Sequence, residues 1–237
     1  MGIIGQLPPT PRLVTYAGWT GQADFGGRGL LTLDTQGSLQ FWWAHLRVGR
    51  DHIAGSFTEK HVLGEGLGDV RALAGVLRRN RLSHPGLVLV RGDGRLEYHP
   101  VSMSRDWKEY TLGAPRVIAT GLSHASALAI FSDSTEQHYW TTVVVADQGQ
   151  LVQYRFTEDA EGPVVRRVLV ADGPRSPKTL RQACSFLPGG DRHGALIAYD
   201  EQGHGQMFAG PWDEQTGEGE LTYIGTTEND ISGEVRF

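Results

Sequence analysis

The chain has 237 residues, with 22 Lys and Arg against 27 Asp and Glu, which gives a formal net charge of −5. This length suffices for one large domain or two small ones, and the negative balance argues against nucleic acid as a partner. The 39% hydrophobic content excludes a disordered chain, while the 32 Gly residues, spread without a collagen period, predict many tight turns.

The cysteine count and the lengths of the apolar runs argue against disulfide-linked, zinc-binding and membrane-spanning proteins. The single Cys184 cannot form an intramolecular disulfide or a Cys-based zinc site. No apolar run approaches the roughly 18 residues of a membrane span, and the N-terminal residues lack the basic and apolar regions of a signal peptide. We therefore expect a cytoplasmic protein without a membrane partner.

The chain repeats one hairpin pattern four times. Each copy is an apolar run, a polar turn that closes on glycine and, after it, the start of a second run. The closing residues recur at intervals of roughly 55 residues; they are Gly37, Gly94, Gly149 and Gly203. A glycine in this position favours a tight turn with positive φ, so each copy predicts a β-hairpin.

Two further runs keep the same period. Stretches of small apolar residues such as 72–76 lie between the hairpins, and an apolar closing run follows each hairpin. One period therefore holds four strands: a small-residue strand, two hairpin strands and a closing strand. In chain order the predicted strands are 12–16, 29–34, 38–43 and 58–63; 70–76, 86–91, 95–100 and 115–120; 125–131, 141–146, 150–156 and 165–170; 179–186, 194–199, 204–209 and 219–224.

Four antiparallel strands in a period of this length are typical of a β-propeller blade. No segment of helical period separates the strands, which argues against an α/β fold. The sequence thus predicts an all-β fold, a β-propeller of four four-stranded blades in one domain, residues 1–237. Residues 2–4 and 232–237 remain as terminal strands, which can form a reduced fifth blade, latch the ring or mate with a second chain as a homo-oligomer. We favour a chain that joins its own two ends.

One blade resembles a known family. The hairpin Arg91–Tyr98 and the following segment Asp106–Gly113 are similar to blades of bacterial propeller lectins of the Photorhabdus-lectin and tachylectin-2 type. The resemblance covers all four repeats in outline and is close only in the second. It implies a lectin-like propeller in which sugars bind between adjacent blades, in pockets lined by Trp and Tyr.

Tryptophan would suit such a pocket, because sugar C–H faces stack on aromatic rings. Six are present, and packing between blades is the more common role for any one of them. Trp19 lies in a glycine-rich stretch, whereas Trp107 and Trp212 lie in predicted outer connections. These three are candidate ligand-binding residues.

A central channel would offer a second site. Polar residues expected along it are Tyr16, Asp69, Arg71, His124, Arg175, Arg181, Glu234 and Arg236. Opposed charges there could act as acid and base, or could form solvated ion pairs. Arg71 and Arg181 are assigned matching register in their blades, so they could clamp an anion. Asp69, Arg71, His124 and Arg181 join the candidate ligand-binding residues, and no catalytic residue is assigned.

Three histidines, His84, His138 and His193, precede the second strand of their blades at near-equivalent positions. Imidazoles around a ring axis could hold a metal, but a His at a strand entrance more often caps a backbone group, and no metal-binding motif is present. We expect neither a metal nor a cofactor.

Three functions remain open, in this order. The first is a non-catalytic module that binds a small or medium ligand, with carbohydrate as the first candidate, in an inter-blade or top-face pocket. The second is a protein-interaction scaffold that uses the broad faces and the end strand of the ring. The third is a lyase, cyclase or isomerase with acid–base groups at the mouth of the channel.

Overall fold

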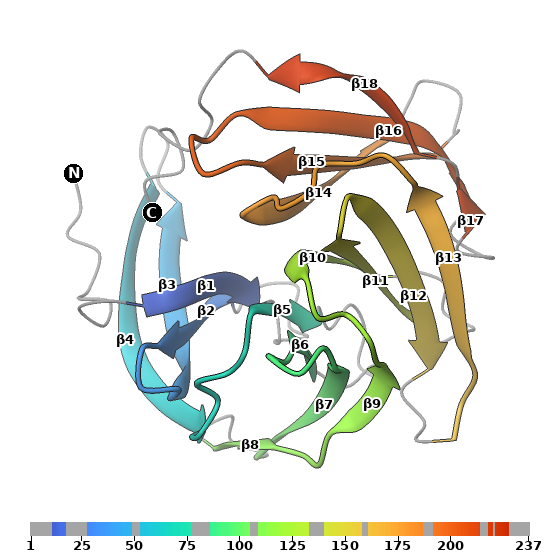
Figure 1. Ribbon diagram of the computed structural model, residues 1–237. Helices are drawn as coiled ribbons and strands as arrows, with labels where there is room; N and C mark the ends of the chain where they lie inside the picture. The colour runs from blue at the N-terminus through green and yellow to red at the C-terminus, as the bar shows by residue number, and fades with distance from the viewer. Residues whose placement is uncertain are drawn as a thin grey trace. The chain divides into compact units, whose positions relative to one another are not determined.

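The computed structural model contains only β-strands and their connections in the residues it describes. These residues are 11–17, 28–48, 53–76, 86–104, 109–132, 140–157, 161–186, 192–213, 218–219 and 221–227. Their eighteen strands form four antiparallel sheets, which we call blades one to four, and they fall into two compact units, Met1–Ala119 and Thr120–Phe237 (Figure 1). No helix long and apolar enough to cross a membrane occurs among them.

Unit 1 holds blades one and two, drawn in blue to green in Figure 1. Blade one has the order β1-β2-β3-β4, with bounds Pro11–Ala17, Arg28–Asp34, Leu39–Val48 and Ile53–Gly64. Blade two has the order β5-β6-β7-β8, with bounds Ala72–Val76, Gly86–Val90, Leu96–Met103 and Tyr110–Leu112, and β9 (Arg116–Ala119) also pairs with β7.

Unit 2 holds blades three and four, drawn in green to red. Blade three has the order β10-β11-β12-β13, with bounds Ala125–Ser132, Trp140–Asp147, Gln150–Thr157 and Val164–Val170. Blade four has the order β14-β15-β16-β17, with bounds Thr179–Phe186, Arg192–Tyr199, Gly205–Asp213 and Glu218–Gly219, and β18 (Thr222–Thr227) also pairs with β16.

The hairpin turns explain why glycine recurs in the sequence. In blades one, two and four the closing residues adopt φ of +85°, +86° and +86°; they are Gly37, Gly94 and Gly203. Asp34 organises the first of these turns, since its Oδ1 accepts the N–H groups of Gln36 and Ser38, each at 2.9 Å. Blade three uses a tighter turn in which Gln148 (φ 51°) and Gly149 (φ 82°) both have positive φ.

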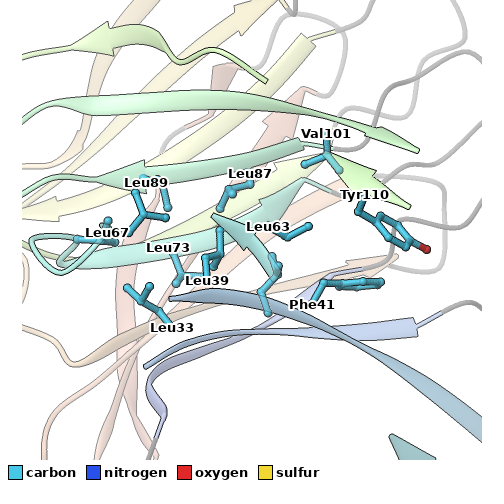
Figure 2. Packing of buried hydrophobic residues seen from close by; sticks show 12 residues of the cluster. Leu33, Leu39, Phe41, Leu63, Leu67, Leu73, Leu87, Leu89, Val101 and Tyr110 are labelled. Atoms are coloured by element: carbon cyan, nitrogen blue, oxygen red, sulfur yellow. The ribbon is translucent and has the colours of Figure 1, made fainter. Parts of the chain in front are cut away.

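In unit 1 the two blades pack face to face. Figure 2 shows Leu33, Leu39 and Phe41 of blade one opposite Leu87 and Leu89 of blade two, and these side chains form one buried cluster. Full burial of each such side chain contributes about 1.5–3 kcal/mol. The small residues of β5 let this innermost strand lie next to β1.

Unit 2 repeats this construction. Its buried cluster joins Val144 and Leu151 of blade three to Leu196 and Phe208 of blade four, and the innermost strands β10 and β14 are neighbours. Consecutive four-stranded antiparallel sheets that pack in this way are typical of β-propellers. The predicted all-β, four-bladed propeller class is confirmed, whereas the terminal strands 2–4 and 232–237 lie outside the described residues.

In unit 1, β3, β4 and β8 differ from the prediction. Strands β3 and β4 extend well past the predicted limits 43 and 58, because their ladder continues from Ala44↔Phe57 to Val48↔Ile53. The outer edge of blade two is divided between β8 and β9, which pair with different halves of β7. Pro115 lies between them and has no N–H to donate, so it interrupts the outer ladder.

Candidate functional site

The structure describes the predicted site residues to different extents. Trp19 and Trp107 lie outside the described residues, as do His84 and His138. Arg181 lies in β14 and Trp212 in β16, and the structure describes only the backbone of these two residues. Asp69, Arg71 and His124 are fully described, and each lies in a connection that leads to the innermost strand of the next blade.

In unit 1 this connection, residues 65–71, is tied to the hairpin turns of both blades. Asp69 forms a two-pronged ion pair with Arg91 of blade two, with Oδ1–NH2 at 2.8 Å and Oδ2–Nε at 3.1 Å. The Arg71 N–H donates to the Val90 carbonyl at 2.8 Å. On the other side, the Leu67 N–H donates to the Gly37 carbonyl at 3.0 Å. Asp69 and the backbone of Arg71 therefore attach this connection to the hairpin of blade two.

In unit 2 the connections are also hydrogen-bonded to the hairpins. The His124 N–H donates to Asp147 Oδ1 of the blade-three turn at 3.2 Å, and the Gly173 N–H donates to the Gly149 carbonyl. The Lys178 N–H donates to the Tyr199 carbonyl at 2.7 Å. The described hydrogen bond of His124 is thus a backbone bond that fixes the loop, and the imidazole itself is exposed.

The register predicted for Arg71 and Arg181 is wrong. The Arg71 N–H bonds the last residue of β6, and the residue in blade four that bonds the last residue of β15 is Lys178. Arg181 lies three residues further along and pairs with Ile197. An odd offset in a strand moves a side chain to the opposite face of the sheet, so the anion clamp inferred from matching register loses its basis.

A charged network that the sequence did not predict runs along β7. Glu97 is 3% exposed and His99 is 6% exposed. The Glu97 carboxylate lies 3.0 Å from Arg95 NH1 and 3.3 Å from His99 Nε2, while His99 Nδ1 lies 3.3 Å from the Gly113 carbonyl oxygen. Both imidazole nitrogens therefore face oxygen acceptors inside the blade.

At the open end of this network, Asp93 and Arg95 form an exposed pair with Oδ2–Nε at 2.7 Å. The Arg95 backbone N–H donates to Asp93 and, with the guanidinium, holds the pKa of Asp93 below its usual value. The Asp93 carboxylate and then Glu97 raise the pKa of Arg95. Glu97 and His99 are buried, and the Glu97 carboxylate and both imidazole nitrogens of His99 have polar partners. This arrangement suits a structural role in blade two.

Trp42, another of the six tryptophans, also has a structural contact. It is half-buried, and its indole N–H donates to Thr32 Oγ1 at 2.9 Å within blade one. The described residues contain no group of three His, Cys, Asp or Glu side chains placed to hold a metal ion.

The exposed large apolar side chains occupy the same kind of position in each blade. In the described ranges all of them lie on the outer strands β4, β9, β13 and β18; they are Val62, Val117, Val164, Val165, Val168, Tyr223 and Ile224. Unit 2 holds most of them: Val165 of β13 is 53% exposed, and Tyr223 and Ile224 of β18 are each 57% exposed. Exposed apolar groups that lie together mark interaction surfaces, and Val164, Val165 and Val168 lie on one short strand.

The similarities of this chain to known proteins are to solved structures. No family model matches the chain, and no curated protein matches it. Among solved structures it is similar to the WD40 domain of SCAP from fission yeast, with 9% identity, a TM-score of 0.46, and coverage of 86% of this chain and 44% of that one. It is also similar to Sqt1 from Chaetomium thermophilum, with 15% identity, a TM-score of 0.39, and coverage of 82% and 43%. The chain thus spans less than half the length of either structure, and neither likeness extends to a function.

Proposed function

We propose that this protein is a non-catalytic protein-interaction module that binds its partners through the outer strands of its blades. The observation that carries the proposal is the position of the exposed apolar side chains, which lie on outer strands throughout the described ranges. Partner binding would remove these side chains from water, at about 25 cal/mol for each Å² of apolar surface buried.

The described polar candidates support a binding module over an enzyme. Asp69 is paired with Arg91, and the backbone of His124 is bonded to the blade-three turn. Glu97 and His99 form an acid–base pair at 3.3 Å, but both are buried and bonded inside blade two. An acid–base catalyst must reach its substrate, and this pair has no exposed face from which to do so.

Some predictions from the sequence stay predictions. Carbohydrate binding near Trp19, Trp107 and Trp212 is the alternative ligand class, and a glycan array with calorimetry on the full chain tests it. The single-domain organisation, the cytoplasmic location and a homo-oligomer through the terminal strands also remain predictions.

Site-specific crosslinking tests the proposed function. A photoreactive amino acid replaces Val165 on β13 or Tyr223 on β18 in the full chain, and two exposed connection residues, Glu65 and Gln202, serve as matched control positions. Adducts formed in cells are identified by mass spectrometry, and the identified protein is purified for a direct binding assay.

We expect adducts at the outer-strand positions and not at Glu65 or Gln202. The purified partner should bind at least tenfold more weakly to Val165→Asp or Tyr223→Asp, whichever position formed the adduct, and equally well to Glu65→Lys. Adducts confined to the control positions, or unchanged binding by the substituted outer strand, would refute the proposal.

A further inference from the structure

We infer that the free edge of β13 binds an extended acidic segment of a partner protein, which adds to blade three as a further β-strand. This inference rests on the proposed function and assigns it one strand and one class of partner. It follows from the backbone, the side chains and the charge of β13 taken together.

The backbone of β13 has one open side. In the sheet order β10-β11-β12-β13 the strand is last, and within the described part of the chain it pairs only with β12, from Leu151↔Val170 to Phe156↔Val164. In an antiparallel ladder, alternate residues direct their N–H and C=O groups away from the neighbouring strand. The outer side of β13 therefore presents a row of backbone donors and acceptors that an extended peptide can use.

The side chains of β13 place an apolar group and a cation on each face of the strand. Val164, Arg166 and Val168 alternate onto one face, and Val165 and Arg167 onto the other. Val164, Val165 and Val168 are exposed, and so is Arg166, while Arg167 is partly exposed. An added strand would contact both faces, so it would gain apolar burial and meet positive charge on both.

The two arginines determine the chemistry of the partner. No salt bridge in the described ranges involves Arg166 or Arg167. Opposite charges directly across a strand pair are stabilising, and like charges are destabilising. The complementary segment therefore has two adjacent Asp or Glu residues, flanked by β-branched apolar residues that lie opposite the valines.

The same charges argue against a second copy of this chain on the edge. If two β13 strands paired antiparallel about a two-fold axis in full register, Arg167 would lie directly opposite Arg167 of the other copy. The next register toward the N-terminus that the pleat allows is shifted by two residues and would place Arg166 opposite Arg166. In either case guanidinium groups face each other, whereas an acidic segment from a different protein places carboxylates there.

Selection from a peptide library tests the inference without knowledge of the partner. Ten-residue random peptides displayed on phage are selected on the full-length protein and counter-selected on the variant Arg166→Glu/Arg167→Glu. We expect enrichment of Pro-free sequences with adjacent acidic residues between β-branched ones. No enrichment over the counter-selected pool would overturn the inference.

One enriched peptide is then synthesised in three forms: unmodified, with both acidic residues changed to Lys, and N-methylated at alternate backbone amides. The unmodified form should bind, and both other forms should bind at least tenfold more weakly. The variant Arg166→Glu/Arg167→Glu should lose tenfold affinity for the unmodified peptide and gain affinity for the Lys peptide. The control variant Arg175→Glu/Lys178→Glu changes the net charge equally at two exposed residues outside β13 and should bind as the wild type does.

Hydrogen exchange locates the bound peptide. Amides in 164–170 should become protected on binding, and amides of β18 should not. Binding without protection of β13, or binding that tolerates N-methylation or charge reversal, would overturn the inference. The crosslinker at Tyr223 reports on β18 separately, so capture of a partner there, together with no peptide binding at β13, would leave the proposed function intact while refuting this inference.

Discussion

Strands β7 and β13 each contain charged residues, and these residues lie in opposite environments. Both combine charged residues with apolar ones, but Glu97 and His99 of β7 are buried and bonded, whereas Arg166 of β13 is exposed and forms no ion pair in the described ranges. The difference follows from position in the blade, because β7 has partners on both sides and β13 is an edge. Charge that is enclosed stabilises one geometry, and charge left at an edge is available to a partner.

Substitutions in the apolar core of unit 1 should cause the largest loss in the free energy of unfolding. Phe41 is fully buried and packs against Tyr110 with ring centroids 4.9 Å apart. Phe41→Ala should lower the free energy of unfolding by about 3–5 kcal/mol, because it leaves a cavity between the two blades. Urea denaturation measures this. A loss similar to that of Val165→Ala on the exposed edge would show that the two blades do not share a core.

Removal of the enclosed carboxylate should have the next largest effect. Glu97→Leu leaves Arg95 and the buried His99 without their shared acceptor, and should cost about 3 kcal/mol in urea denaturation. The double variant Glu97→Leu/His99→Leu is the control, since it removes both buried polar groups and should lose less than Glu97→Leu alone. A double variant that is less stable than the single variant would contradict a structural network on β7.

Gly37 and Gly66 allow the cost of positive φ to be separated from the cost of a close backbone contact. Gly37→Ala should lower stability by about 2 kcal/mol, because Gly37 has φ of +85° and an added Cβ would overlap the backbone of Gly68. Gly66 has φ of +72° with nothing near its Cβ position, so Gly66→Ala should cost only about 1 kcal/mol. Equal losses in thermal denaturation would show that the contact between turn and loop has no energetic role.

The exposed pair at the end of β7 should have a small, pH-dependent effect. The Arg95 backbone N–H and guanidinium lower the pKa of Asp93 in the folded state. The contribution of this carboxylate to stability is therefore present above its unfolded-state pKa of 3.8 and is lost as the pH falls through the lower folded-state pKa. The Tm difference between wild type and Asp93→Asn should therefore shrink as the pH is lowered from 6 to 3. A Tm difference that is constant over this range would rule out the folded-state interaction.

Substitutions on the free edge should affect stability least of all. Val165→Thr should change the free energy of unfolding by less than about 0.5 kcal/mol, because its side chain is 53% exposed and loses little packing. The same variant should weaken binding of the selected acidic peptide. A large loss of stability in urea denaturation would mean that β13 is enclosed by the protein itself and is not an open edge.

The repeat in the sequence predicts the strands well, for a local reason. A closing glycine such as Gly94 is needed wherever a turn requires positive φ, and small residues such as Ala74 are needed where innermost strands crowd together, so both mark the blades directly. Strand β8 was not predicted, because its pairing depends on how Pro115 divides the outer edge of blade two.

The site was predicted less well, because burial depends on neighbours that are distant in the sequence. Glu97 and His99 alternate with Leu96 and Tyr98, a pattern that suggests a solvent-facing side, yet the other blade elements enclose them. The exposure of Val165 was missed for the converse reason, since an apolar run suggests burial. Asp69 was singled out correctly as a polar loop residue, but its two-pronged contact with Arg91 ties it into the fold.

The most direct test of β13 as a binding edge is the affinity of the selected acidic peptide for three forms of the full-length protein, measured by calorimetry at equal ionic strength. We expect equal affinity for the wild type and Arg175→Glu/Lys178→Glu, and at least tenfold weaker binding by Arg166→Glu/Arg167→Glu. Equal affinity for all three forms would contradict the claim that the free edge of β13 is the binding surface.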